Sequence, residues 1–311
     1  MEEYEERVHY LFIDAFLNYV DAEDTRDFLD VIGQLDAIIV EDDNYFQAYQ
    51  LKARILNKLE RHGEALEAWN KSIELEKDHY FEGYEDDAGE YPSEINRMVT
   101  YSRLGADEQA LALCEKIIGK YVDDSLALEN RVIFTFNLKN YKKVIELCEE
   151  LEKKFPPAIH SIKNIGKPPT FYYKQKISAN IRNIYATSLY FEKRFEESES
   201  VMKETLESYP NDTECLQNMS QLLLERGNPQ DAFEYINKAT EIDRTDAELW
   251  VQKAEILVAL GNIEETLDCL LIATSLKPEI KSDIKSQREF SFRNIAENDR
   301  YRRIISESKN I

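Results

Sequence analysis

A pattern of apolar side chains recurs at an interval of 34 residues along most of this 311-residue chain. Two of the intervals are longer, and each equals one period plus an insert of 11 or 20 residues. A fixed period of about 20 to 50 residues is typical of repeat architectures, in which each unit buries its apolar face only against its neighbours. The period therefore decides the fold class. The repeats start at Phe46, Tyr91, Ser125, Ala179, Thr213 and Ala247.

The second half of every repeat carries three residues at spacings of four and then three, which places them on one face of a helix. The first residue is always small or β-branched, as a close approach of two helices requires, and the middle one is usually larger. The six triplets are Ala65/Trp69/Ser72, Ala110/Cys114/Ile117, Val144/Cys148/Leu151, Ser198/Met202/Thr205, Ala232/Ile236/Ala239 and Thr266/Leu270/Ala273.

The first half of the repeat carries a second helical stripe, such as Trp250, Ala254 and Leu257. A short break follows this stripe, and proline ends the second helix because it lacks an N–H group. Each repeat is therefore predicted to be a helix, a tight turn and a second helix. The breaks lie at Gly105, Gly227 and Gly261, and the prolines are Pro156, Pro210 and Pro278.

The columns around Trp250, Gly261, Ala273 and Pro278 resemble the tetratricopeptide repeat, a family of stacked helical hairpins. The resemblance implies an all-α fold, a right-handed superhelical solenoid whose first helices line the concave side. The sequence departs from the family pattern in three places. Lys253 and Ala254 replace the usual Leu-Gly pair, while Glu94 and Arg182 occupy the aromatic column of their first helices.

We predict a single solenoid over residues 1–311, closed by a C-terminal capping segment that is similar to the closing segment of bacterial family members. Its residues Ile295, Tyr301 and Ile304 are expected to point inward, with its arginines outward, so that the apolar face of the last repeat is covered. The repeats are predicted at 12–45, 46–79, 91–124, 125–158, 179–212, 213–246 and 247–280, the inserts at 80–90 and 159–178, and the cap at 281–311.

The resemblance also implies that partners bind on the concave side. Amide side chains there can satisfy the backbone of an extended peptide or partner helix, and Ile133, Phe136 and Tyr190 offer anchors. Ordinary solvated helix positions are the alternative explanation for each residue. The candidate groove residues are Gln50, Arg54, Ile95, Val99, Glu129, Ile133, Phe136, Asn183, Thr187, Tyr190, Gln217, Gln221, Val251 and Glu255.

The family's carboxylate clamp, which binds acidic C-termini through cations on successive first helices, is absent from the corresponding positions. The net charge is −22, so we expect a protein or peptide partner that is neutral or basic, with no nucleic acid and no membrane. Residues 159–178 break the acidic pattern with four lysines and no acid. This insert is expected to fold back on the chain, to plug the groove or to form a second contact site. The clamp positions hold Asn183, Thr187, Asn218, Glu248 and Gln252.

The titratable residues suggest no chemistry. The histidines have no Ser or Cys partner at catalytic spacing, and the chain has no phosphate-binding glycine loop. The cysteines show neither a CxxC pair nor a histidine at metal spacing, so we expect reduced core residues, a cytoplasmic location, and no catalytic residue, metal or cofactor. These residues are His9, His62, His79 and His160, and Cys114, Cys148, Cys215 and Cys269.

The sequence thus predicts a non-enzymatic scaffold or adaptor for protein–protein interaction, which holds a peptide or partner segment in its concave groove. A regulatory peptide sensor and an assembly factor or co-chaperone of the same class are the alternatives. An enzyme and an RNA-binding repeat protein rank below them.

Overall fold

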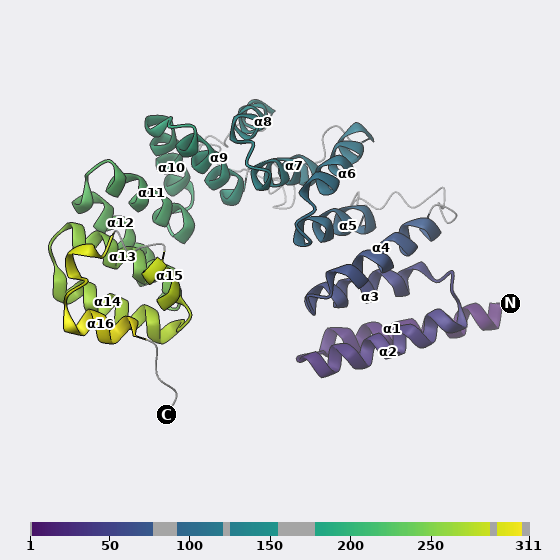
Figure 1. Cartoon of the computed structure of the whole chain (residues 1–311). Coiled ribbons are helices and arrows are strands. Elements are labelled where there is room, and N and C mark those ends of the chain that lie inside the picture. Colours follow the sequence, from purple (N-terminus) through teal and green to yellow (C-terminus); the bar gives the residue numbers. More distant parts are fainter. Residues whose placement is uncertain (1, 77–91, 121–124, 155–177, 287–290, 307–311) are drawn as a thin grey trace, which may run out of the picture. The chain divides into compact units, whose positions relative to one another are not determined.

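The computed structural model describes residues 2–76, 92–120, 125–154, 178–286 and 291–306, and every regular element in these ranges is helical (Figure 1). This confirms the all-α prediction. Both predicted inserts lie outside the described residues, except for Ser178. The helices are α1 Glu2–Asp21, α2 Thr25–Glu41, α3 Phe46–Lys58, α4 His62–Glu76, α5 Pro92–Arg103, α6 Asp107–Lys120, α7 Ser125–Asn137, α8 Tyr141–Lys154, α9 Ala179–Phe191, α10 Phe195–Ser208, α11 Thr213–Glu225, α12 Pro229–Ile242, α13 Ala247–Ala259, α14 Ile263–Leu276, α15 Ile280–Ser286, η2 Arg293–Ile295 and α16 Asp299–Ile305.

The chain forms two compact units, Met1–Asn140 and Tyr141–Ile311, and the division falls between α7 and α8. Within each unit a first helix packs on its own second helix, and that second helix packs on the next first helix: α3 on α4 and α4 on α5, or α11 on α12 and α12 on α13. Each unit is therefore an α solenoid. That the two units continue one solenoid stays a prediction. None of the described helices is both long and apolar enough to cross a membrane.

The second-helix stripe forms the contact between repeats, as the sequence predicted. All eighteen side chains of the six triplets are at most 3% exposed. Short side chains of the stripe allow close approach on both sides. The Cys114 thiol donates to the Ala127 carbonyl of the next repeat at 3.0 Å, and the Ser198 hydroxyl donates to the Ala186 carbonyl of its own repeat at 2.7 Å. Packing at this density makes each repeat depend on its neighbours.

In each of the six repeats from Phe46 onward, the turn between the first and the second helix has one residue in the left-handed conformation, at the fifteenth position of the repeat, whereas the turn between α1 and α2 has none. At Gly227 (φ +78°), the next N–H, that of Asn228, reaches the Leu223 carbonyl at 2.9 Å, which is the Schellman arrangement that ends a helix. The glycines explain only half of the turns. The six left-handed residues are Glu60, Gly105, Lys139, Lys193, Gly227 and Gly261.

A cation at the seventh position of four first helices reaches back to the second helix of the preceding repeat. Lys253, which replaces the family's usual leucine, donates to the side-chain Oδ1 of Asn237 at 2.7 Å. The long stem of such a side chain covers apolar surface while its charged end bonds at the edge. The other three pairs are Lys52 with Asp36 (2.5 Å), Arg97 with Asn70 (3.1 Å) and Arg131 with Glu115 (3.8 Å).

The capping segment closes the last repeat. Phe292, Ile295, Tyr301 and Ile304 are buried in one cluster with residues of α13 and α14, which confirms the predicted cap. Arg300 joins the cap to α14: it donates to Glu264 at 3.0 Å and also pairs with Asp268.

Candidate functional site

The candidate groove residues lie on first helices and form one set in each unit. In the N-terminal unit, Arg54 is exposed and the other described candidates are half-buried. The side chain of Ile95 lies outside the described residues. In the C-terminal unit the residues lie on three successive first helices. They are Asn183, Thr187 and Tyr190 on α9, Gln217 and Gln221 on α11, and Val251 and Glu255 on α13. The N-terminal set is Gln50 and Arg54 on α3, Ile95 and Val99 on α5, and Glu129, Ile133 and Phe136 on α7.

Hydrogen bonds connect the first helices of the C-terminal unit at two levels. The Asn183 amide donates to Asp212 Oδ1 at 2.9 Å and to Glu214 Oε2 at 3.3 Å. One turn further along, the Asn218 amide donates to Thr187 Oγ1 at 3.5 Å. These polar side chains are therefore held in position before any ligand arrives, which lowers the entropy cost of binding.

A second network follows nearer the C-terminal ends of the same helices. Gln252 Nε2 donates to Ser220 Oγ at 2.9 Å and to the Gln217 carbonyl at 3.1 Å. The Gln221 amide donates to Glu225 at 2.8 Å, and the Tyr190 hydroxyl donates to the same carboxylate. Burial, and then the hydrogen bond to Glu225, raise the pKa of Tyr190, so this hydroxyl stays protonated and is a fixed donor.

Two candidates are not on open surface, and the prediction is corrected for them. Val251 is 0% exposed and belongs to the apolar cluster shared with the cap. Asn183 is 1% exposed because it packs between α9 and the start of α11, and its Oδ1 is buried without a hydrogen-bond partner. The repeat period places a residue on a helix face, but it cannot show how far the adjacent helix covers that face.

Arg182 explains one departure from the family pattern. It is 7% exposed, and its guanidinium donates to Glu204 at 2.8 Å and to Thr205 at 3.1 Å, with Glu152 of α8 at 3.8 Å. Burial raises the pKa of Glu152 even though Arg182 acts in the opposite direction. An ionic cluster thus forms around the position that an aromatic side chain occupies in the family pattern.

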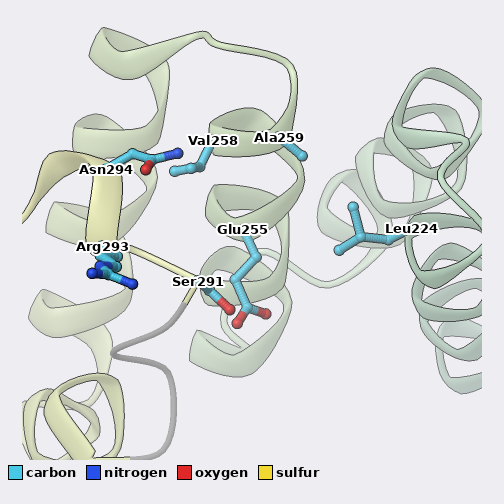
Figure 2. A pocket seen from close by; sticks show the side chains of 7 residues that line it. All are labelled: Leu224, Glu255, Val258, Ala259, Ser291, Arg293 and Asn294. Atoms are coloured by element: carbon cyan, nitrogen blue, oxygen red, sulfur yellow. The ribbon is translucent and has the colours of Figure 1, made fainter.

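The cap and two first helices line an open pocket of ≈ 560 Å³ at one end of this surface (Figure 2). Leu224, Val258 and Ala259 supply apolar walls, and Arg293 is the one cation among the lining residues. Arg293 and Asn294 come from η2, so the cap contributes to the surface that it closes. The lining residues are Leu224 on α11, Glu255, Val258 and Ala259 on α13, and Ser291, Arg293 and Asn294.

Of these lining residues, the sequence predicted only Glu255. Leu224 and Val258 occupy the twelfth position of their repeats, the same position as Phe136 and Tyr190, which were candidates. The repeat period could therefore have identified Leu224 and Val258 as candidates. Arg293 and Asn294 lie after the last repeat, where no period extends, so they could not be found in this way.

A tetratricopeptide repeat family model matches residues 46–79 and 213–246. No curated protein matches the chain in sequence. A tetratricopeptide repeat protein from Parabacteroides merdae is 18% identical, with a TM-score of 0.65 over 92% of this chain and 98% of that one. YrrB is 17% identical over 72% of this chain and 99% of its own, with a TM-score of 0.45. TTC0263 of Thermus thermophilus is 16% identical over 64% of this chain and 96% of its own, with a TM-score of 0.48.

The Parabacteroides protein supports the fold over nearly the whole chain. The two matched repeats coincide with α3–α4 and α11–α12, where the buried stripes and the left-handed turns have been described. The chain therefore carries tetratricopeptide repeats at 46–79 and 213–246, and its described helices share the fold of a tetratricopeptide repeat protein.

Proposed function

We propose that this chain is a non-enzymatic scaffold that binds an extended segment of a partner protein on the first-helix surface of α9, α11 and α13. The observation that carries this proposal is the pocket that the cap forms with α11 and α13. Interfaces concentrate their binding energy in a few side chains buried in pockets, surrounded by polar groups. The apolar walls at Leu224 and Val258 suit such an anchor, and Asn294 and Ser291 supply polar groups beside it.

The charges along this surface support a neutral or basic partner segment. Carboxylates occur from its α9 edge to the pocket, at Asp212, Glu214, Glu225 and Glu255. A partner with cations along its length would be attracted over the whole surface, and Arg293 would donate hydrogen bonds to a carboxylate or a carbonyl oxygen at the pocket end.

The polar network supports a general scaffold over the co-chaperone alternative, because the clamp that binds acidic C-termini needs cations at these positions. Four of the five clamp positions hold amide or hydroxyl groups, and Asn183, Asn218 and Gln252 already bond to neighbouring first helices. The four cysteines are free and buried, which supports the cytoplasmic location as part of the same proposal.

A random peptide library displayed on phage, selected against the full chain, tests the proposal. We expect the selected peptides to lose affinity for Val258→Arg, which fills the pocket with a bulky cation, and to keep it for Gln230→Arg on the exposed side of α12. Peptides that bind Val258→Arg normally but fail on Gln230→Arg would move the binding surface to the second helices and contradict the proposal.

A further inference from the structure

The N-terminal helix carries an apolar stripe that no described element of its own unit covers. Six of the sixteen exposed large apolar residues of the described chain lie in α1. Four of them follow each other at spacings of three, four and three: Tyr10 (66% exposed), Ile13 (38%), Leu17 (54%) and Val20 (61%). Singly scattered apolar residues are normal on a surface, but a contiguous row marks an interaction site.

The other faces of α1 are occupied by its own unit. Val8 and Ala15 are buried in the cluster shared with α2 and α3. Asn18 donates to Gln34 of α2 at 3.0 Å, and His9 meets the Tyr45 hydroxyl, just before α3, at 3.0 Å. With about 3.6 residues per turn, Leu17 is opposite Ala15 and Val8, so the stripe faces away from both neighbours. Figure 1 shows α1 lying along α2.

Carboxylates accompany the stripe. Glu6, Asp14 and Asp21 are exposed, and none of them pairs with another residue in the described part of the chain. The nearby cation Arg7 does not neutralise them, because it pairs with Glu41 of α2 at 3.3 Å. A ligand that buries the stripe therefore brings its own flanking groups next to unneutralised negative charge.

We propose that the α1 stripe docks a cationic amphipathic helix of a partner protein. The 3-4-3 spacing is that of a helix–helix seam, and the stripe is about 15 Å long, which a second helix matches along its whole length. Lysine or arginine beside the seam would neutralise Glu6, Asp14 and Asp21. A second copy of this chain is the less favourable occupant, because it brings the same carboxylates and another net charge of −22.

The test uses two synthetic peptides of about 18 residues, five helical turns. Both have leucine at the seam positions; one has lysine at the flanking positions and the other glutamate. Their affinity for the full chain is measured by fluorescence anisotropy at low and high salt. We expect the lysine peptide to bind, the glutamate peptide not to bind, and salt to weaken binding because it screens exposed charges.

Protein variants locate the site. Leu17→Ser is expected to weaken the lysine peptide about tenfold, since more than half of that side chain is available for burial. Leu126→Ser on α7 is the matched control, because Leu126 is 50% exposed and lies outside the stripe, and it should change nothing. Asp14→Asn with Asp21→Asn should weaken binding about twofold to fivefold and reduce the salt dependence.

Three results would overturn the proposal. Equal affinity for wild type and Leu17→Ser would show that the lysine peptide binds elsewhere on the acidic surface. Equal binding of the glutamate peptide would remove the charge argument. Sedimentation velocity that finds a dimer of the wild type, dissociated by Leu17→Ser, would assign the stripe to a second copy. This proposal is independent of the C-terminal surface, since Val258→Arg leaves α1 unchanged.

Discussion

The left-handed turn position gives the sharpest prediction about how the sequence specifies the fold. Gly227 has φ +78°, and a Cβ atom built on it would meet nothing within 4 Å. Gly227→Ala therefore introduces no clash, and its cost is that of placing an L-residue in the left-handed region. That strain is about 1–2 kcal/mol, offset by about 0.4–1 kcal/mol because alanine restricts the unfolded chain. We expect a net loss of about 0.5–1 kcal/mol.

The same position in another repeat allows the reverse experiment. Lys193 has φ +62°, and its side chain is exposed, so Lys193→Gly relieves the strain and removes no described contact. This variant should be more stable by about 0.5–1 kcal/mol. Gly33→Ala is the control: Gly33 lies inside α2 with open space around it and no positive φ, so alanine there should stabilise by about 1 kcal/mol.

Urea unfolding of the full chain, followed by far-UV circular dichroism, measures all three changes, and hydrogen exchange of the α11 and α12 amides locates the effect of Gly227→Ala. The opposite signs of Gly227→Ala and Gly33→Ala separate the turn conformation from a general effect of replacing glycine. A more stable Gly227→Ala, or a Lys193→Gly variant that loses about 1 kcal/mol, would show that the turn conformation does not limit stability.

Three further changes test the interior of the C-terminal unit. Asn183→Asp should lower the free energy of unfolding by about 2 kcal/mol at pH 7, because it replaces a donor with a third carboxylate beside Asp212 and Glu214. The loss should be smaller at pH 4, and a loss that does not depend on pH would contradict this reasoning. The pKa of Glu152 is raised in the folded state, so stability falls as pH rises above the pKa that Glu152 has in the unfolded chain. Glu152→Gln should therefore raise the urea midpoint at pH 7 but not at pH 4. Equal shifts at the two pH values would refute burial as the cause. Phe292→Ala should cost about 3–5 kcal/mol locally and expose the 280–306 amides to hydrogen exchange, whereas unchanged protection would remove the capping role.

The repeat period correctly predicted which residues are buried where one helix packs on the next. The second-helix triplets are buried because each residue position is fixed by the helical spacing, and spacing is readable in a single chain. The same reasoning predicted that Ile295, Tyr301 and Ile304 of the cap would point inward. These elements need only the amphipathic pattern, not the details of side-chain contacts.

Other features could not be predicted because they depend on turn geometry or on contacts with another element. The left-handed conformation of Lys139 and Lys193 follows from the turn geometry and carries no glycine signal. The burial of Asn183 depends on Asp212 and Glu214 at the start of α11, and the position of Arg293 depends on how the cap folds back. For Asn183 and Arg293, the deciding partner lies outside the element that carries the residue.

Hydrogen exchange on the full chain, with and without a library-selected peptide, tests the central claim most directly. The account predicts slower exchange in α11, α13 and residues 291–295, with the exposed side of α12 and α14 unchanged, because bound backbone and side chains restrict opening of the first helices. Protection confined to α12 and α14, or no protection around the pocket that Val258 lines, would contradict binding on the first-helix surface.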